Sequence, residues 1–156
     1  MIGKNIEKRR EVDEMEILVI DAQGGGMGCE LVGQLRAALG PQARIIAVGT
    51  NVLATNAMLK AGATAGATGE NAAVFNAGRA DVILGPIGII MANAMLGEIT
   101  PAIACAVSSS RAEKILIPAT RCAVKVMGLR SASLSTYIAE AVAAVKNLMG
   151  DDRERK

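Results

Sequence analysis

The chain has 156 residues and a net charge of +2, with charges of both signs spread along it, so we expect one domain and no surface suited to nucleic acid. It contains one Phe, one Tyr and no Trp, which leaves no set of aromatic side chains for stacking bases. It contains no His, which excludes Ser-His-Asp and Cys-His catalysis and His-based zinc sites.

Cysteine content and hydropathy indicate a soluble, cytoplasmic protein. Cys29, Cys105 and Cys122 are too few and too scattered for a metal cage or a disulfide framework, so we expect no metal and a reducing compartment. The uncharged run from Val82 to Gly97 is shorter than the about 20 residues of a spanning helix, and Gly, Pro and Asn interrupt it. We therefore expect a strand and a buried helix there, and no membrane segment.

Short apolar runs alternate with helical patterns between two polar ends. Residues 1–14 are predicted to be a flexible tail with Met15 as the natural start, residues 15–150 a single domain, and residues 151–156 a charged tail. Predicted strands cover residues 15–21, 43–48, 63–67, 81–84, 114–117 and 122–127. Predicted helices cover residues 29–39, 52–61, 71–77, 87–107 with a candidate kink at Pro101, and 134–149 with Ser131 or Ser133 as its cap.

The order of these elements predicts an α/β fold. The continuous apolar run MEILVID at residues 15–21 is typical of a central parallel strand buried on both faces. Alternating strands and helices then predict a three-layer, doubly wound, mostly parallel, Rossmann-like sheet. The link between residues 114–117 and 122–127 is too short for a helical crossover, so we expect an antiparallel edge strand near the C-terminus.

The predicted helix 87–107 is apolar on more than one face. A helix that covers a sheet needs one apolar stripe only, so this helix is either deeply buried under the last helix or part of a subunit interface. A small domain has little room to bury a helix all round, which favours the interface. We expect a homodimer formed through this helix.

A glycine-rich turn follows the first strand. The segment from Gln23 to Gly28 reads QGGGMG, between a buried strand and a helix. Glycines let the backbone turn tightly and let a phosphate approach bare N–H groups, and the helix N-terminus adds partial positive charge. The turn predicts a site for a phosphorylated small molecule. The alternative is that the glycines only make a tight turn against a neighbouring helix.

The turn matches the dinucleotide fingerprint G-x-G-x-x-G imperfectly. With Gly25 and Gly28 as the second and third glycines, Gln23 holds the first position; with Gly24 and Gly26 as the first and second, Cys29 holds the third. The second predicted strand also ends in Gly-Thr-Asn, without the carboxylate that usually binds the ribose. The sequence therefore supports an anion site more strongly than an NAD(P) site.

In a doubly wound sheet, ligands lie at the carboxyl ends of the strands. We expect the ligand to meet polar or glycine residues that follow successive strands, with Asn51 near a ribose. Asn51 and Thr68 are alternatively good helix caps. The candidate binding residues are Gln23, Gly24, Gly25, Gly26, Met27, Gly28, Thr50, Asn51, Gly69, Glu70, Asn71, Gly85 and Pro86, followed by Thr120 and Arg121 after the fifth strand.

Two residues are candidates for catalysis. Cys122 follows Arg121, whose guanidinium favours a thiolate, and Glu70 is the carboxylate that can serve as a general base near the ligand. Cys29 and Cys105 are expected to pack as small apolar residues in the core. Tyr137 is followed four residues later by Ala, so the Tyr-Lys pair of short-chain dehydrogenases is absent.

Five segments together resemble a small bacterial family of uncharacterised proteins, a domain of unknown function. They are VIDAQGGGMG, VGTNVLAT, GATGENA, DVILGPIGII and KILIPATRC, and the resemblance covers residues 15–145. Members of that family typically begin at the first strand, in line with Met15 as the start. The resemblance implies a shared site and no particular activity.

The leading hypothesis is a cytoplasmic Rossmann-like protein that binds a nucleotide, an NAD(P)-like dinucleotide or another phosphorylated small molecule at Gly24–Gly28. A second hypothesis is a non-catalytic sensor or carrier, which the lack of His and of an acid–base pair favours. A third is a small enzyme that uses Cys122 or Glu70 on a phosphorylated substrate.

Overall fold

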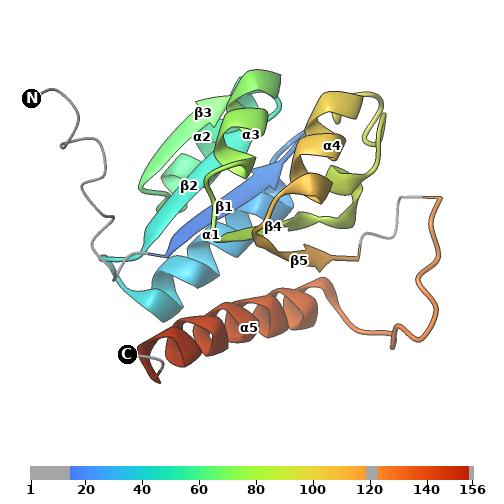
Figure 1. Ribbon diagram of the computed structural model, residues 1–156. Coiled ribbons are helices and arrows are strands. Elements are labelled where there is room, and N and C mark those ends of the chain that lie inside the picture. The colour runs from blue at the N-terminus through green and yellow to red at the C-terminus, as the bar shows by residue number, and fades with distance from the viewer. Residues whose placement is uncertain (1–14, 119–122, 155–156) are drawn as a thin grey trace, which may run out of the picture.

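A computed structural model describes residues 15–118 and 123–154, with side chains described as far as residue 150 (Figure 1). The strands are β1 (Glu16–Asp21), β2 (Arg44–Gly49), β3 (Ala65–Thr68), β4 (Val82–Pro86) and β5 (Glu113–Ile117). The helices are α1 (Gly26–Leu39), α2 (Val52–Lys60), α3 (Glu70–Ala77), α4 (Pro101–Ser109), α5 (Leu134–Glu154) and the short 3-10 helix η1 (Ile87–Ile90).

The five strands form one parallel sheet in the order β3-β2-β1-β4-β5. β1 lies at the centre, where Ile17 is in register with Ile45 of β2 and with Val82 of β4. The chain builds outward from β1 to β3 and then crosses back to add β4 and β5 on the other side. The strand order therefore reverses between β1 and β4, and this is the point where open α/β sheets bind ligands. The fold is α/β and Rossmann-like.

Helices cover both faces of the sheet. Side chains that alternate along β1 enter two cores: Ile17 and Val19 pack with residues of α1, α2 and α5, whereas Leu18 and Ile20 pack with residues of α3 and α4. Figure 1 shows α1 and α5 on one face of the sheet and α3 and α4 on the other. All six residues of β1 are buried, which explains why its sequence is continuously apolar from Ile17 to Ile20.

The expected antiparallel edge strand is wrong. Every strand pair in the described sheet is parallel, and residues 123–127 form no strand. Cys122, the first residue of the predicted strand, lies outside the described residues. Val124, Val126 and Met127 are 47%, 46% and 87% exposed, so the alternating pattern buries no apolar surface that would stabilise a strand there. After this segment the chain enters α5, which continues into the predicted charged tail.

The expected long helix 87–107 is also wrong. η1 ends at Ile90, and α4 begins only at Pro101, which takes the first helical turn, where a proline needs no N–H bond. Thr100 caps α4 by accepting a hydrogen bond from the N–H of Ile103 at 3.2 Å. Ile99 and Ile103 are buried inside the same domain, and the continuous helix on which the expected dimer was based is absent, so the homodimer stays a prediction. None of the described helices is both long and apolar enough to span a bilayer.

Candidate functional site

Two of the glycines after β1 are required by packing. Gly25 is the N-cap of α1 with a φ of +72°, and a Cβ there would lie 2.7 Å from the Cα of Ala54. A Cβ on Gly28 would lie 2.6 Å from the Sδ of Met58. Gly25 and Gly28 stand at the second and third glycine positions when Gln23, with a φ of +52°, is aligned with the first.

The other two glycines of the turn face open space. Gly24 and Gly26 are exposed, and a Cβ on either residue would meet nothing within 4 Å. Within the described chain, no protein group accepts a hydrogen bond from the N–H of Gly24, Gly26 or Met27. Packing does not explain these glycines, and three N–H groups are left available at the start of α1.

The buried carboxylate of Asp21 binds backbone N–H groups on both sides of the glycine-rich turn. The two oxygens of Asp21 accept hydrogen bonds from the N–H of Ala22 at 2.8 Å and of Gly28 at 2.7 Å. Burial raises the pKa of Asp21 above its usual value, although the two N–H bonds oppose the rise and the nearby Glu98 adds to it. The N–H of Gly28 is therefore already engaged within the protein.

We expect Asp21→Asn to destabilise the turn. An amide offers one oxygen, so one of the two buried N–H groups would face the NH₂ instead of an acceptor, which costs about 1–3 kcal/mol. Urea unfolding of the variant measures the loss, with Glu113→Gln as a control, because Glu113 is exposed. Equal stability of Asp21→Asn and wild type would show that the carboxylate does not hold the turn.

A second carboxylate reaches the end of β2 from elsewhere in the chain. The Oε2 of Glu98, on the loop between η1 and α4, accepts hydrogen bonds from the N–H of Gln23 at 2.6 Å and the hydroxyl of Thr50 at 2.7 Å. The N–H of Gln23 is the main cause that lowers the pKa of Glu98, and the Thr50 hydroxyl is the second. We did not predict this residue from the sequence. One signal was present: Glu98 is the single charged residue between Asp81 and Arg111.

Asn51 joins the same cluster and also caps a helix. Its Oδ1 accepts a hydrogen bond from the N–H of Ala54 at 2.9 Å, which confirms the interpretation as the cap of α2. Its Nδ2 donates to the carbonyl of Gln23 at 2.9 Å and to Glu98 at 3.4 Å. Thr68 is not a cap: Gly69 holds that position at α3, and the Thr68 hydroxyl bonds that of Thr55 at 2.7 Å.

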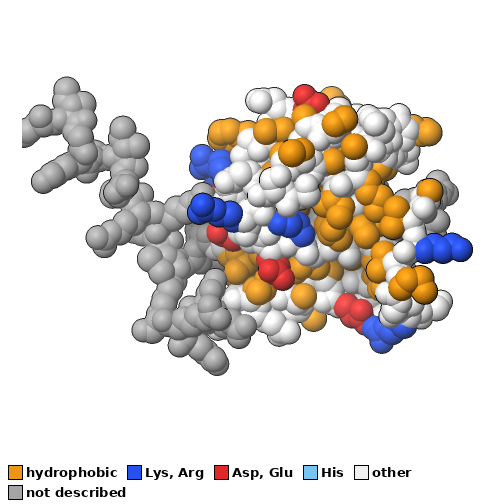
Figure 2. Space-filling model, turned by 45° about the vertical axis from the view of Figure 1, so that its right-hand side comes forward, with side chains coloured by type: hydrophobic (Ala, Val, Ile, Leu, Met, Phe, Trp, Pro, Cys, Tyr) orange, Lys and Arg blue, Asp and Glu red, His pale blue; other side chains and the backbone are white. Residues whose placement is uncertain are grey.

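A cavity of about 350 Å³ opens beside the glycine turn, at the carboxyl ends of β1 and β4. A second cavity of about 530 Å³ shares Gln23 and Met95 with it and is otherwise lined by Gly88, residues 91–94, Leu96, Ala123 and Val124. Figure 2, which turns this end of the sheet toward the viewer, shows hydrophobic side chains gathered on this face. The first cavity is lined by Asp21, Ala22, Gln23, Gly24, Gly25, Gly26, Met27, Pro86, Met95, Pro118, Ala132, Leu134 and Tyr137.

The remaining candidate binding residues lie apart from this cavity. Gly69, Glu70 and Asn71 follow β3 at the edge of the sheet, two strands away from β1. Gly85 lies within β4 against the carbonyl of Ile20, where a Cβ would clash. Pro86, the last residue of β4, is the candidate binding residue from the described later strands that lines the cavity.

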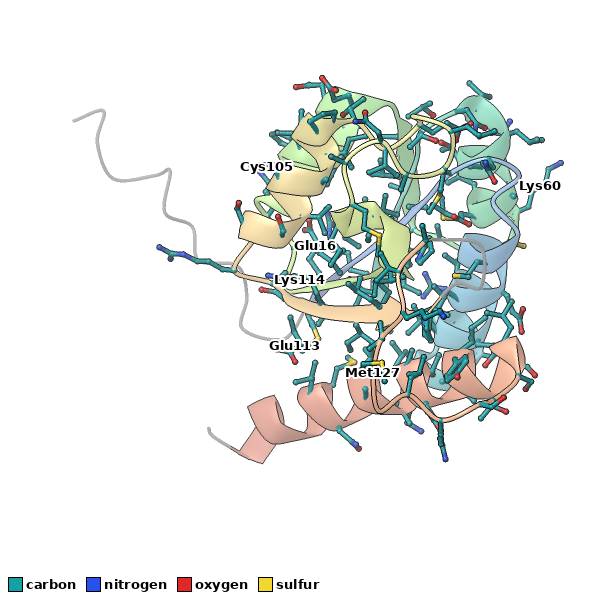
Figure 3. All side chains as sticks on the ribbon, turned by 90° about the vertical axis from the view of Figure 1, so that its right-hand side faces the viewer. Glu16, Lys60, Cys105, Glu113, Lys114 and Met127 are labelled. Atoms are coloured by element: carbon teal, nitrogen blue, oxygen red, sulfur yellow. The ribbon has the colours of Figure 1, made fainter. Side chains whose placement is uncertain are left out.

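The two cysteines that the structure describes, Cys29 and Cys105, differ in solvent exposure. Cys122 lies outside the described residues, as do Thr120 and Arg121. The prediction that Cys105 lies in the core is wrong. Cys105 is exposed on α4, because Ile103, Ala104 and Val107 form the buried face of that helix (Figure 3). Cys29 is partly buried in the first turns of α1. The described residues contain no group of three Cys, Asp or Glu side chains placed to hold a metal ion.

A family described as "Domain of unknown function (DUF3842)" matches residues 16–150 of the chain. The match runs from β1 into α5 and includes the glycine turn, Asp21 and Glu98. No curated protein matches the chain.

Proposed function

The chain belongs to the family of the domain of unknown function DUF3842, and we propose that it binds a phosphorylated small molecule, such as a nucleotide, at the turn between β1 and α1. The observation that carries this proposal is the set of three available N–H groups on Gly24, Gly26 and Met27, beside a cavity at the switch point of the sheet. The bound phosphate would accept hydrogen bonds from these groups.

The physical basis is the positive end of α1. Unpaired N–H groups at a helix start carry partial positive charge and point at the ligand, and glycine lets a phosphate reach them. Gly24 and Gly26 keep that approach free of side chains, whereas Gly25 and Gly28 shape the backbone. The apolar lining of the cavity, with Pro86 among it, suits the body of such a ligand.

A sensor or carrier is the activity that the described site favours over catalysis. The titratable side chains that line the described cavity are Asp21 and Tyr137, and both are engaged: Asp21 with backbone N–H groups and Tyr137 with the carbonyl of Arg130. An enzyme that uses Cys122 is the alternative, and it predicts that Cys122→Ala abolishes turnover without changing binding. The free thiols of Cys29 and Cys105 suit a reducing cytoplasm.

A charge reversal inside the turn tests the proposal. Gly26→Asp places a carboxylate in open space at the first residue of α1, where the fold tolerates it but a phosphate is repelled. We expect affinity to fall at least about tenfold. Gly26→Asn is the matched control, since it adds the same bulk without the charge and should bind more tightly than Gly26→Asp.

Thermal shift supplies the measurement. Wild type and both variants are screened with NAD, NADP, ATP, coenzyme A, nucleosides and sugar phosphates. A ligand at about 100 times its Kd stabilises the folded state by about 2.7 kcal/mol, so its Tm rise is measurable. An equal rise for wild type and Gly26→Asp would place the ligand elsewhere and contradict the proposal.

A further inference from the structure

We infer that Glu98 restricts the site to ligands with a single phosphate group and excludes dinucleotides. The inference rests on the proposed function and concerns which ligands the turn accepts. A dinucleotide at a Rossmann turn extends from the phosphates toward the end of the second strand, where its ribose is bound. In this chain, the carboxylate of Glu98 fills that place.

The contacts of Glu98 use the polar groups that a second nucleotide would need. One carboxylate oxygen accepts hydrogen bonds from Gln23, Thr50 and Asn51, at the joint ends of β1 and β2. These are the residues expected from the sequence to meet a ribose or a phosphate. While Glu98 is in place, the N–H of Gln23, the hydroxyl of Thr50 and the side-chain amide of Asn51 donate to protein oxygens.

The loop that carries Glu98 is built to hold it. Asn93, Met95 and Leu96 have positive φ values of 64°, 56° and 57°, a strained conformation for residues with side chains. The strain persists because the N–H of Asn93 donates to the carbonyl of Ile99 at 2.7 Å, and Ile99 is buried. The structure thus fixes the carboxylate over the sheet, and a weak ligand contact would not displace it.

Charge also disfavours a pyrophosphate at this site. The lowered pKa of Glu98 keeps its carboxylate ionised at neutral pH, and Asp21 lies below the same turn. Among the residues that the structure describes, no Lys or Arg lines either cavity, and the N–H groups of the turn are the groups that offset the charge of a ligand there. The cavity beside the turn extends toward Pro86, Pro118 and α5, and neither Thr50 nor Asn51 lines it. A single phosphate on Gly26 and Met27 would therefore direct the rest of its ligand there.

The test compares AMP with NAD, which contains AMP and adds a second phosphate and nucleoside. Titrations followed by ¹⁵N NMR show which amides shift and give an affinity for each ligand. For the wild-type chain we expect AMP to shift the amides of Gly24, Gly26 and Met27 and to bind at least about tenfold more tightly than NAD. NAD binding as tight as AMP would overturn the inference and leave the proposed function standing.

Variants locate the cause. Glu98→Ala should raise the affinity for NAD at least about tenfold, with the Gln23 amide now shifting on binding. Glu113→Ala removes the same charge at the start of β5, at the end of the strand opposite to the cavity, and should leave NAD binding unchanged (Figure 3). Weaker NAD binding in Glu98→Ala would make Glu98 a ribose ligand and overturn the inference. If AMP, NAD and inorganic phosphate all leave the turn amides unshifted, the proposed function fails, and this inference fails with it.

Discussion

Gly25→Ala is expected to lower the free energy of unfolding by about 2–5 kcal/mol, whereas Gly24→Ala, one residue earlier, is expected to leave it nearly unchanged. At Gly25 the φ of +72° disfavours any side chain, and the new Cβ would lie 2.7 Å from the backbone of Ala54, which cannot move without shifting α2. At Gly24 the new Cβ would meet no atom within 4 Å. The pair makes the same chemical change at adjacent positions.

Urea unfolding followed by circular dichroism measures both variants. A fall in the midpoint for Gly25→Ala alone would show that the turn contains two kinds of glycine. Gly25 would then serve the contact between the turn and α2, and Gly24 would be free for another role, such as contact with a ligand. Equal stability of the two variants would contradict the close approach of Gly25 to Ala54.

The core of the fold could be predicted because it depends on local sequence patterns. The predicted strands 15–21 and 114–117 differ from β1 and β5 by one residue at one end, and the predicted strand 43–48 differs from β2 by one residue at each end. The apolar runs of β1 and β2 are continuous because both faces of the sheet are covered there, and Asp21 and Gly49 end them. The alternation of these strands with helices then predicted that neighbouring strands of the sheet are parallel.

The two wrong elements depend on contacts between distant residues. The segment 87–107 is apolar enough for a helix, but a strained loop that includes Met95 and Leu96 interrupts it, and residues far away in the sequence hold that loop. The segment 123–127 has the alternation of a strand but no partner on the sheet. An apolar pattern in the sequence indicates that a segment can be buried, but it does not indicate which other elements the segment packs against.

The site was predicted in part for the same reason. The position of the glycine turn after β1 follows from local sequence, and so does the cap formed by Asn51. The cluster around Glu98 does not, because it joins residues 23, 50, 51 and 98 from three separate loops. A carboxylate therefore lies at the end of β2, but it belongs to a residue nearly fifty positions later in the sequence and its Oε2 is bound by protein donors.

Ile138→Ala tests whether α5 is an integral part of the domain and of the cavity wall. Ile138 is fully buried in the core that α5 forms with α1 and the sheet, so removing three carbons should cost about 2–5 kcal/mol. Leu53→Ala is the matched control: it removes three carbons from a side chain that is 67% exposed on α2 and should cost less than about 0.5 kcal/mol.

The binding readout makes the prediction specific to the site. Leu134 and Tyr137, just before Ile138, line the cavity beside the glycine turn. Loss of the Ile138 contact should loosen this end of α5. Ile138→Ala should therefore also lower the affinity for the ligand identified by thermal shift, whereas Leu53→Ala should leave that affinity unchanged. If Ile138→Ala is as stable as Leu53→Ala, α5 does not pack on the sheet as described, and the cavity lacks one of its walls. If the variant loses stability but binds ligand fully at a temperature where it is folded, the ligand is held by the turn without help from α5.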